Sequence, residues 1–375
     1  MEGLKVIELS TYVAVPKAAR MMADWGAEVI KVEPPGGEAW RWMGRVWGLP
    51  AAENNNPLFH SENANKKSLS LDLKKEAGRE AFLKLLERAD IFMTNTRSKA
   101  LEKLGLDYET LSLKFPKLIY AHFSGFGDEG PEKNRPGFDV AAFWARSGAL
   151  IEWGALESSP NRPHPGFGDG TVASALLSGI LASLYKRTQT GKGDKIRASL
   201  LGTALWYNST GILMGQPAYG HQYPKSKFNQ PTPFSNLYQT KDKDWIMISA
   251  PDYENRKDGL FDLVGLSGLK DNPKYATLEA CRQNGNMREI VEILIHAFAK
   301  TDTKIILDGL EKMDIVYEKL ANPAELYTDP QAWANGYLHE LKLENGDTVV
   351  LPTNPIKFNN MDPPEFNLGP QLGAD

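Results

Sequence analysis

The first two hundred residues alternate short apolar runs with amphipathic stretches. The apolar runs predict five strands, at Leu4–Leu9, Glu28–Glu33, Ser68–Leu73, Ile91–Thr94 and Leu118–Phe123. Helical spacing of apolar residues predicts helices at Pro16–Trp25, Lys75–Ala89 and Lys99–Leu113, and a helix of small residues at Thr171–Tyr185. Strands that alternate with helices indicate an α/β domain with a parallel sheet, whose ligands bind at the carboxyl ends of the strands.

The pattern changes after residue 200. Gly211 to Pro233 is rich in Gly, Pro, Asn and Tyr, without clean periodicity. Two hairpins are predicted after it, at Leu237–Thr240 with Trp245–Ala250 and at His339–Leu343 with Thr348–Leu351. Three helices are predicted between the hairpins, at Arg256–Val264, Met287–Lys300 and Thr303–Met313. We therefore expect a large domain at 1–205, a linker at 206–230, a smaller α+β domain at 231–354, and a return of 355–375 to the large domain.

Composition narrows the class of protein. A chain of 375 residues exceeds the usual size of one domain, and a formal charge of −4 argues against a general binder of nucleic-acid backbones. The single cysteine, Cys281, cannot form an internal disulfide, which suits a reducing compartment. The chain enters a strand at once, and the apolar run Ala175–Tyr185 is short and interrupted. We expect a cytoplasmic protein that binds neither nucleic acid nor membrane.

Asp169 is the strongest candidate for chemistry. It stands between two glycines in Gly168-Asp169-Gly170, directly before the helix of small residues. Glycine neighbours leave a carboxylate open to close approach by another molecule, so Asp169 could act as a nucleophile toward an activated acyl group. Asp-Gly is also a common turn pair, and a plain helix-entry turn is the alternative.

Nucleotide fingerprints are missing from the first domain. The turn after the first strand, Ser10 to Pro16, contains no glycine, and Gly191-Lys192-Gly193-Asp194 is not a P-loop. Two polar clusters could still hold phosphate and ribose oxygens, one at Asn63 to Ser68 and one at Asn95 to Lys99 with Lys103. Solvated loop charges and turn formers are the alternative for both clusters.

Ordered motifs along nearly the whole chain resemble those of the class III CoA-transferases, the family of formyl-CoA, carnitine and bile-acid CoA-transferases. The matching segments are Val6 to Leu9, Gly26 to Gly37, Asn65 to Lys74, Ala89 to Asp107, Ser124 to Gly127 with Gly130-Pro131, Gly137 to Asp139, and Gly168-Asp169. The resemblance implies an interlocked-ring homodimer in which each chain has a Rossmann-like large domain and a small domain. It also implies coenzyme A and acyl-CoA as substrates, with no permanently bound cofactor and no metal.

The same resemblance assigns roles to residues. Asp169 matches the nucleophile, which attacks the donor thioester to give a mixed anhydride and then an aspartyl-CoA thioester. The implied CoA contacts are Val13, Ala14, Leu71, Asp72, Leu73, Lys74, Asn95, Thr96, Arg97, Lys103, Arg135, Pro136, Gly137 and Phe138. Three departures weaken the match to formyl-CoA transferase: Pro34 and Lys103 stand where that enzyme has arginines, and Ala250 to Tyr253 replaces its glycine-rich loop.

One branch of the same family, the α-methylacyl-CoA racemases, matches this chain less well than the transferases do. The α-methylacyl-CoA racemases carry Gly-His-Asp where this chain has Gly137-Phe138-Asp139, and phenylalanine cannot transfer a proton. His164 is a poor substitute, since it stands in a loop between two prolines. A racemase-type isomerase and a non-catalytic CoA-binding protein remain the alternatives to a transferase.

Other segments look most like transferases that act on 2-hydroxy acids, such as the phenyllactate and 2-hydroxyisocaproate CoA-transferases of amino-acid-fermenting anaerobes. These segments are Gly105 to Leu111, Pro136 to Gly148 and Gln331 to Leu338. Phe143, Trp144, Trp40 and Trp42 could line an apolar acyl pocket, although core or interface positions are as good an interpretation for each of them.

Overall fold

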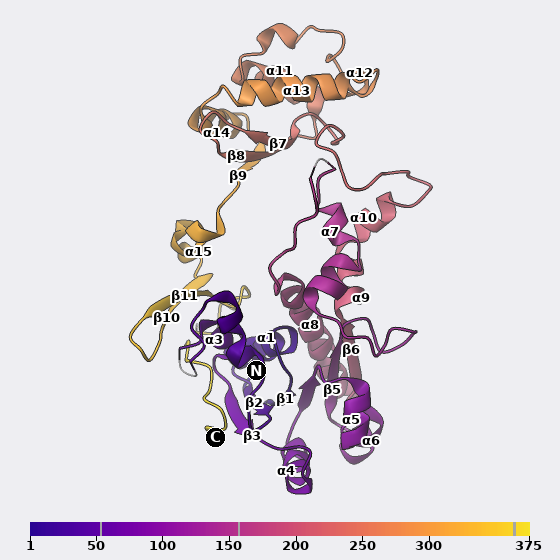
Figure 1. Ribbon diagram of the computed structural model, residues 1–375, viewed down its shortest axis with the longest axis vertical. Coiled ribbons are helices and arrows are strands. Elements are labelled where there is room, and N and C mark those ends of the chain that lie inside the picture. Colours follow the sequence, from indigo (N-terminus) through magenta and orange to yellow (C-terminus); the bar gives the residue numbers. More distant parts are fainter. Residues whose placement is uncertain (53–54, 157, 363–364) are drawn as a thin grey trace. The chain divides into compact units, whose positions relative to one another are not determined.

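The computed structural model describes residues 1–52, 55–156, 158–362 and 365–375, which form two compact units. Unit 1 comprises Met1–Leu150, Arg162–Tyr219 and Tyr327–Asp375, and unit 2 comprises Ile151–Asn161 and Gly220–Leu326. Each unit has its own sheet and its own apolar core (Figure 1).

Unit 1 is built on a six-stranded parallel sheet with the strand order β3-β2-β1-β4-β5-β6. Its strands are β1 (Lys5–Leu9), β2 (Glu28–Glu33), β3 (Lys67–Ser70), β4 (Ile91–Thr94), β5 (Ile119–Ser124) and β6 (Lys195–Ser199). The strand order reverses between β1 and β4, and such a switch point leaves a crevice at the carboxyl ends of the strands. The prediction of a parallel α/β sheet is confirmed.

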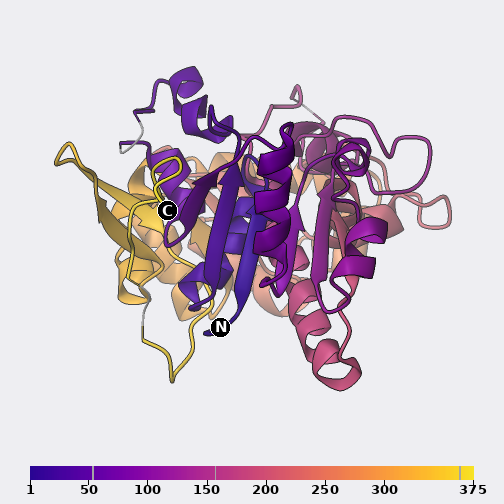
Figure 2. The ribbon, with the colours of Figure 1, turned by 90° about the horizontal axis from the view of Figure 1, so that it is seen from below.

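Helices cover both faces of this sheet (Figures 1 and 2). Alternate strand residues point to opposite faces, so Val6 packs in one core with α1 (Ala14–Asp24) and α8 (Phe167–Thr190), whereas Ile7 packs in another. The helices of the second core are α4 (Glu76–Leu86), α5 (Ser98–Leu104) and α6 (Tyr108–Lys114). Further short helices of unit 1 are α2 (Trp40–Met43), η1 (Gly44–Trp47), α3 (Pro57–Asn63), η2 (Asp139–Ala145), α9 (Leu200–Tyr207), α10 (Ser209–Met214) and α15 (Pro330–Ala334).

Helix α8 starts earlier and ends later than the sequence pattern predicts. Gly166 adopts a left-handed conformation (φ 112°) and precedes the first helical residue, Phe167, so Asp169 lies inside the first turn rather than before the helix. Among the described residues, α8 is the one helix that is long and apolar enough to span a bilayer by length and composition. Val172, Leu176 and Ile180 on this helix are buried in the core of unit 1.

Other elements differ from prediction for local reasons. The helix expected at Lys99–Leu113 is divided into α5 and α6, because Gly105 ends α5 in a left-handed conformation (φ 67°) and Asp107 caps α6 by accepting a hydrogen bond from the Thr110 amide. Helix α9 runs into the start of the predicted linker and α10 lies within that linker, and β6 was not predicted.

Unit 2 contains an antiparallel sheet with the order β7-β8-β9 and a helical layer. Its strands are β7 (Ser235–Gln239), β8 (Trp245–Ser249) and β9 (Val316–Lys319). Its main helices are α11 (Tyr253–Leu263), α12 (Leu278–Arg282), α13 (Asn286–Phe298) and α14 (Thr303–Lys312), with a short turn at η3 (Ser267–Leu269). Two short helices, α7 (Ala149–Glu152) and η4 (Pro323–Thr328), run across the points where the chain passes from one unit to the other. Cys281 is buried, and its thiol donates a hydrogen bond to the Tyr253 hydroxyl.

The C-terminal segment belongs to unit 1. The predicted second hairpin is present as β10 (Leu338–Lys342) and β11 (Thr348–Pro352), but it lies in unit 1, whereas the sequence pattern places it in the small domain. Side-chain contacts with earlier parts of unit 1 explain this position. Asn55 accepts a hydrogen bond from the Asn345 amide, and Arg20 lies over the ring of Phe366, on which the His339 ring stacks at 3.6 Å. The chain ends beside β3, where Asp375 accepts a hydrogen bond from the Ser68 amide.

Candidate functional site

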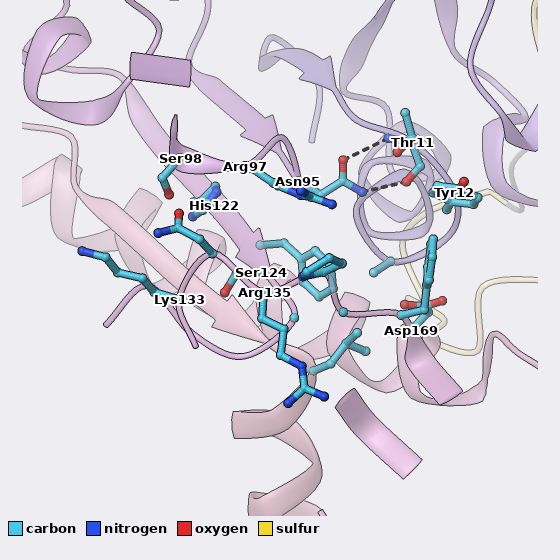
Figure 3. A pocket seen from close by; sticks show the side chains of 18 of the residues that line it. Thr11, Tyr12, Asn95, Arg97, Ser98, His122, Ser124, Lys133, Arg135 and Asp169 are labelled. Carbon is cyan, nitrogen blue, oxygen red and sulfur yellow. Dashed lines mark hydrogen bonds between the residues drawn. The ribbon is translucent and has the colours of Figure 1, made fainter. Parts of the chain in front are cut away.

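A cavity of about 260 Å³ lies at the switch point of the sheet. Its wall is formed by segments that follow β1, β4 and β5, together with the start of α8. The lining residues are Thr11, Tyr12, Val13, Ala14, Asn95, Arg97, Ser98, His122, Phe123, Ser124, Gly125, Lys133, Asn134, Arg135, Pro136, Gly137, Phe138, Asp169 and Leu200. Lys133, Ser98 and His122 lie toward one end of this cavity and Asp169 and Tyr12 toward the other (Figure 3).

The side chain of Asn95 joins the loop that follows β1 to the loop that follows β4. The Asn95 amide group donates to the Thr11 carbonyl at 2.7 Å and accepts from the Thr11 amide at 3.0 Å (Figure 3). This reciprocal pair reproduces the pattern of a strand ladder beyond the ends of β1 and β4, and it fixes the separation of the two loops. Asn95 is therefore a structural brace as well as a lining residue.

A buried charge network lies behind the loop that follows β1. Glu8 bonds to the ammonium groups of both Lys31 (2.8 Å) and Lys66 (2.7 Å), and all three side chains are fully buried. Burial opposes the ionisation of Glu8, but the two ammonium groups outweigh it and lower the pKa of Glu8 to about 2. Lys31 also donates to the Ser10 carbonyl, and Glu38 accepts from the Tyr12 amide at 3.1 Å, so the network holds Tyr12 in its left-handed conformation (φ 65°).

Asp169 stands in an environment that opposes its negative charge. Burial raises its pKa to about 7, the nearby carboxylates of Asp139 and Glu62 add to the shift, and the ammonium of Lys17 reduces it. Lys17 forms an ion pair with Glu62 at 3.1 Å. A carboxylate with a pKa near neutrality is a stronger base than an ordinary aspartate and is still ionised in part at neutral pH, which suits a nucleophile.

Asp139 fixes the backbone that carries Asp169. Its carboxylate accepts a hydrogen bond from the Gly166 amide at 2.6 Å. A Cβ atom at Gly168 would lie 2.2 Å from Asp139 Oδ1 and 2.4 Å from Phe143 Cγ, so only glycine fits there. The tight contact sets the position of the first turn of α8 and with it the direction of Asp169.

A second cavity of about 350 Å³ adjoins the first one through Ser98, His122, Lys133 and Asn134, which line both. Lys99, Lys195 and Tyr108 also line the second cavity, together with the acidic residues Glu102, Asp107, Glu109 and Asp128. The lysines and amides are suitable donors to phosphate oxygens. The described residues contain no group of three or more His, Cys, Asp or Glu side chains placed to hold a metal ion.

The structure brings together most, but not all, of the residues that the sequence singles out. Nine line the first cavity: Val13, Ala14, Asn95, Arg97, Arg135, Pro136, Gly137, Phe138 and Asp169. Thr96 does not line the cavity, although Asn95 and Arg97 on either side of it do. Its carbonyl oxygen lies within hydrogen-bond distance of His122 Nε2. Leu71, Asp72, Leu73, Lys74 and Lys103 line neither cavity.

The aromatic residues expected in an acyl pocket lie elsewhere. Phe143 and Trp144 are buried in the core of unit 1, and Trp40 is buried against Val13 and Phe59. Trp42 lines a different cavity. The cavity instead presents Tyr12 and Phe138, whose rings contact each other edge to face at 5.2 Å, together with Phe123.

Sequence reasoning missed Thr11, Tyr12, His122, Lys133 and Asn134 as lining residues. His122 carries a usable signal, because it is a polar residue inside the apolar strand run Ile119 to Phe123, next to the carboxyl end of the strand. Lys133 and Asn134 stand in a segment without periodicity, where nothing in the sequence indicates the direction of a side chain.

The family model and the most similar proteins that we compared are all CoA-transferases. The sequence profile of a family described as CoA-transferase family III matches residues 1–375. The chain is 36% identical over 373 residues to (R)-2-hydroxy-4-methylpentanoate CoA-transferase of Clostridioides difficile, covering 100% of this chain and 92% of that protein. It is 38% identical over 380 residues to cinnamoyl-CoA:phenyllactate CoA-transferase of Clostridium sporogenes, covering 100% of this chain and 90% of that protein.

A solved structure shares the fold over the whole chain. The crystal structure of a CaiB/BaiF family protein from Brucella suis superposes with a TM-score of 0.83 at 27% identity, covering 99% of this chain and 96% of that one.

Proposed function

The chain belongs to CoA-transferase family III, and from this premise we propose that it transfers CoA from an acyl-CoA thioester to a free 2-hydroxy acid, with Asp169 as the nucleophile. The observation that carries the proposal is the position of Asp169 in the wall of the switch-point cavity, beside the groups suited to bind a CoA ester. Its pKa of about 7, raised first by burial, adds to its suitability.

The proposed reaction uses four acyl exchanges. The Asp169 carboxylate attacks the carbonyl carbon of the donor thioester, the C–S bond breaks, and an acyl-aspartyl anhydride and CoA thiolate result. The thiolate attacks the Asp169 carbonyl of the anhydride, which releases the donor acid and leaves an aspartyl-CoA thioester. The acceptor carboxylate attacks this thioester to form a second anhydride and releases CoA thiolate, which then takes the acyl group and frees Asp169. Covalent exchange keeps the energy of the thioester from being lost to water.

The two adjoining cavities are the proposed binding site for the CoA moiety. Val13, Ala14, Asn95, Arg97 and the segment Arg135 to Phe138 line the cavity that contains Asp169. Lys99, Lys133 and Lys195 in the second cavity offer cations to phosphate groups. For Thr96, Leu71 to Lys74 and Lys103 the proposal of a CoA contact rests on the family resemblance alone.

The relatives support the class of acceptor. Both of the transferases that this chain resembles at 36% and 38% identity are named for 2-hydroxy acids with an apolar side chain. We extend this to (R)-2-hydroxyisocaproate or phenyllactate as acceptors here, and Tyr12 and Phe138 supply an apolar wall near Asp169 for such a side chain. Phe138 also offers no proton-transferring group, so we do not favour racemisation.

We also propose that two copies of the chain form the interlocked homodimer implied by the family. Apolar side chains on α9 and α10 are exposed in the single chain: Leu205, Trp206, Tyr207, Ile212 and Leu213. Clustered exposed apolar residues of this kind usually mark an interface. A cytoplasmic location remains a prediction from the sequence.

The experiment that tests the function is an exchange assay. The protein is incubated with isocaproyl-CoA, cinnamoyl-CoA or acetyl-CoA and a panel of 2-hydroxy acids in both configurations, and the CoA esters are followed by mass spectrometry. We expect new 2-hydroxyacyl-CoA esters with the wild type and a loss of more than about 1,000-fold in Asp169→Asn. Undiminished exchange in Asp169→Asn would exclude the proposed nucleophile. Solvent deuterium at the α-carbon of a recovered 2-methylacyl-CoA would favour the racemase instead.

A further inference from the structure

His122 on β5 is buried between two loops of the candidate site. The residue is only 3% exposed. Nδ1 lies 3.0 Å from Oδ1 and 3.2 Å from Oδ2 of Asp128, and Nε2 lies 3.1 Å from the carbonyl oxygen of Thr96. Asp128 and Thr96 stand in different loops, so one ring bridges the segment after β4 and the segment after β5.

Both partners of the ring can only accept a hydrogen bond. A carboxylate and a backbone carbonyl carry no proton to donate, whereas a neutral imidazole has one donor nitrogen and one acceptor nitrogen. Both contacts are hydrogen bonds only in the state in which both ring nitrogens carry protons, that is, the imidazolium. The Asp128 carboxylate matches this state: burial alone would raise its pKa, but the hydrogen bond from His122 and the charges of His122, Lys195 and Arg197 lower it.

The two loops that His122 joins carry groups proposed to bind CoA. Thr96 stands between Asn95, which braces Thr11, and Arg97. Asp128 stands in the loop that leaves β5 at Ser124 and leads to Lys133 and Arg135. The two ends of this second loop approach each other so closely that only glycine fits, since a Cβ atom at Gly125 would lie 2.8 Å from the Gly137 Cα atom. Hydrogen bonds thus run from Asp128 through His122 and the Thr96–Asn95 segment to Thr11, across all three loops.

We propose that His122 is a positioning residue that, as an imidazolium, holds these three loops in the arrangement that binds a CoA ester, so that binding weakens when the ring loses a proton at higher pH. This inference rests on the proposed function of the cavity. Other charged groups face the pair: Lys133 in the same loop, Lys195 and Arg197 on β6, Glu129 paired with Arg197 at 2.9 Å, and Asp107 and Glu109 near the second cavity. Lysine, arginine and carboxylate side chains ordinarily titrate far from neutrality, whereas histidine ordinarily titrates close to it.

The test separates binding from chemistry by using the Asp169→Asn variant as the parent. Its affinity for isocaproyl-CoA is measured by calorimetry at about pH 7 and about pH 9, where CoA phosphates stay ionised. We expect the dissociation constant to rise about fivefold to tenfold between the two values, since charge-assisted hydrogen bonds are lost. Adding His122→Gln is expected to weaken binding at about pH 7 by a similar factor and to abolish the pH dependence.

Two further variants complete the design. Asp128→Asn in the same parent is expected to reduce the pH dependence as well, and it decides the question if His122→Gln does not fold. Glu129→Gln is the matched control, because this neighbouring carboxylate pairs with Arg197 and not with His122, and it should behave as the parent. Ring nitrogen chemical shifts of His122 give a readout that needs no ligand, and they should report two protonated nitrogens at neutral pH.

Affinity of the parent that does not change with pH would overturn the role of His122, as would a neutral ring tautomer at neutral pH or unchanged pH dependence in His122→Gln. These results would leave the exchange activity of the wild type untouched. Absence of CoA-ester binding at both pH values, together with absence of exchange by the wild type, would instead overturn the proposed function.

Discussion

Asp169 is the residue on which the chemistry depends, and its neighbours set its charge. Burial and the carboxylates of Asp139 and Glu62 raise its pKa to about 7, while Lys17 opposes the shift. Lys17 and Glu62 pair with each other at 3.1 Å, so each partly cancels the effect of the other on Asp169. The nucleophile is ionised above this pKa and protonated below it.

The turnover number should therefore rise with pH through about 7 and then level off. Lys17→Met should raise the pKa of Asp169 and move this rise to higher pH by roughly half a unit to one unit, and Glu62→Gln should move it to lower pH. The pH profile of kcat with a saturating donor checks the prediction. Lys114→Met, an exposed lysine at the end of α6, is the control. Identical profiles for all three variants would show that these side chains do not tune Asp169.

Site residues could be predicted from the sequence only where their neighbours along the chain mark them. Asp169 is conspicuous because glycines flank it, and Asn95 and Arg97 follow a recognisable strand. Tyr12 and His122 depend on contacts between segments far apart in the chain, such as the Thr96–His122 and Tyr12–Glu38 hydrogen bonds. Spacing along the chain does not report such contacts.

At the scale of elements, the first turn of α8 joins the fold to the chemistry. Gly166 precedes the helix in a left-handed conformation, and Gly168 packs against Asp139 and Phe143 with no room for a side chain. The sequence predicts this helix but not its start, because the left-handed Gly166 is a tertiary feature. Strands β1, β2 and β4 were predicted within a residue from their apolar runs. The edge strand β6 was not, since its Lys195-Ile196-Arg197-Ala198-Ser199 sequence is short and polar.

Gly168→Ala should displace this turn. The added methyl would lie 2.2 Å from Asp139 Oδ1, so we expect a loss of about 1–3 kcal/mol in the free energy of unfolding and strongly reduced exchange. Gly170→Ala is the matched control for stability, because its Cβ would lie 3.8 Å from Lys17 Cδ, an ordinary contact. Urea denaturation of both variants checks the prediction, which is wrong if the two alanines cost the same.

For the whole molecule, the buried charges of unit 1 should make stability depend on pH. Glu8 is surrounded by Lys31 and Lys66 without exposure to water, whereas Glu28 and Lys67 form a similar pair at the surface between β2 and β3. A buried charge left without its partner is costly, while exposed pairs contribute little.

Glu8→Gln should lower the free energy of unfolding by about 3–5 kcal/mol near neutral pH, and Glu28→Gln by less than about 1 kcal/mol. The folded pKa of Glu8, about 2, lies below its ordinary value of 4.5. Its stabilising effect is therefore complete above about pH 4.5 and is lost as the pH falls toward 2. Urea denaturation across this range checks both points, and a constant difference down to the lowest pH would contradict the assignment.

The exposed apolar residues of α9 and α10 predict that two copies of the chain form a dimer. We expect a dimer in light scattering at micromolar concentration, and we expect Trp206→Lys with Ile212→Lys to weaken it at least tenfold, because both side chains are exposed in the single chain. Leu113→Lys, an isolated exposed leucine at the end of α6, should leave the dimer intact. A monomeric wild type would contradict the proposed assembly.

The most direct test of the central claim is to look for CoA bound covalently to Asp169. The protein is incubated with isocaproyl-CoA in the absence of an acceptor acid, digested, and analysed by mass spectrometry. We predict a CoA adduct on the peptide that contains Asp169, which disappears when a 2-hydroxy acid is added and is absent in Asp169→Asn. An adduct on another residue, or an undiminished adduct in Asp169→Asn, would contradict the account.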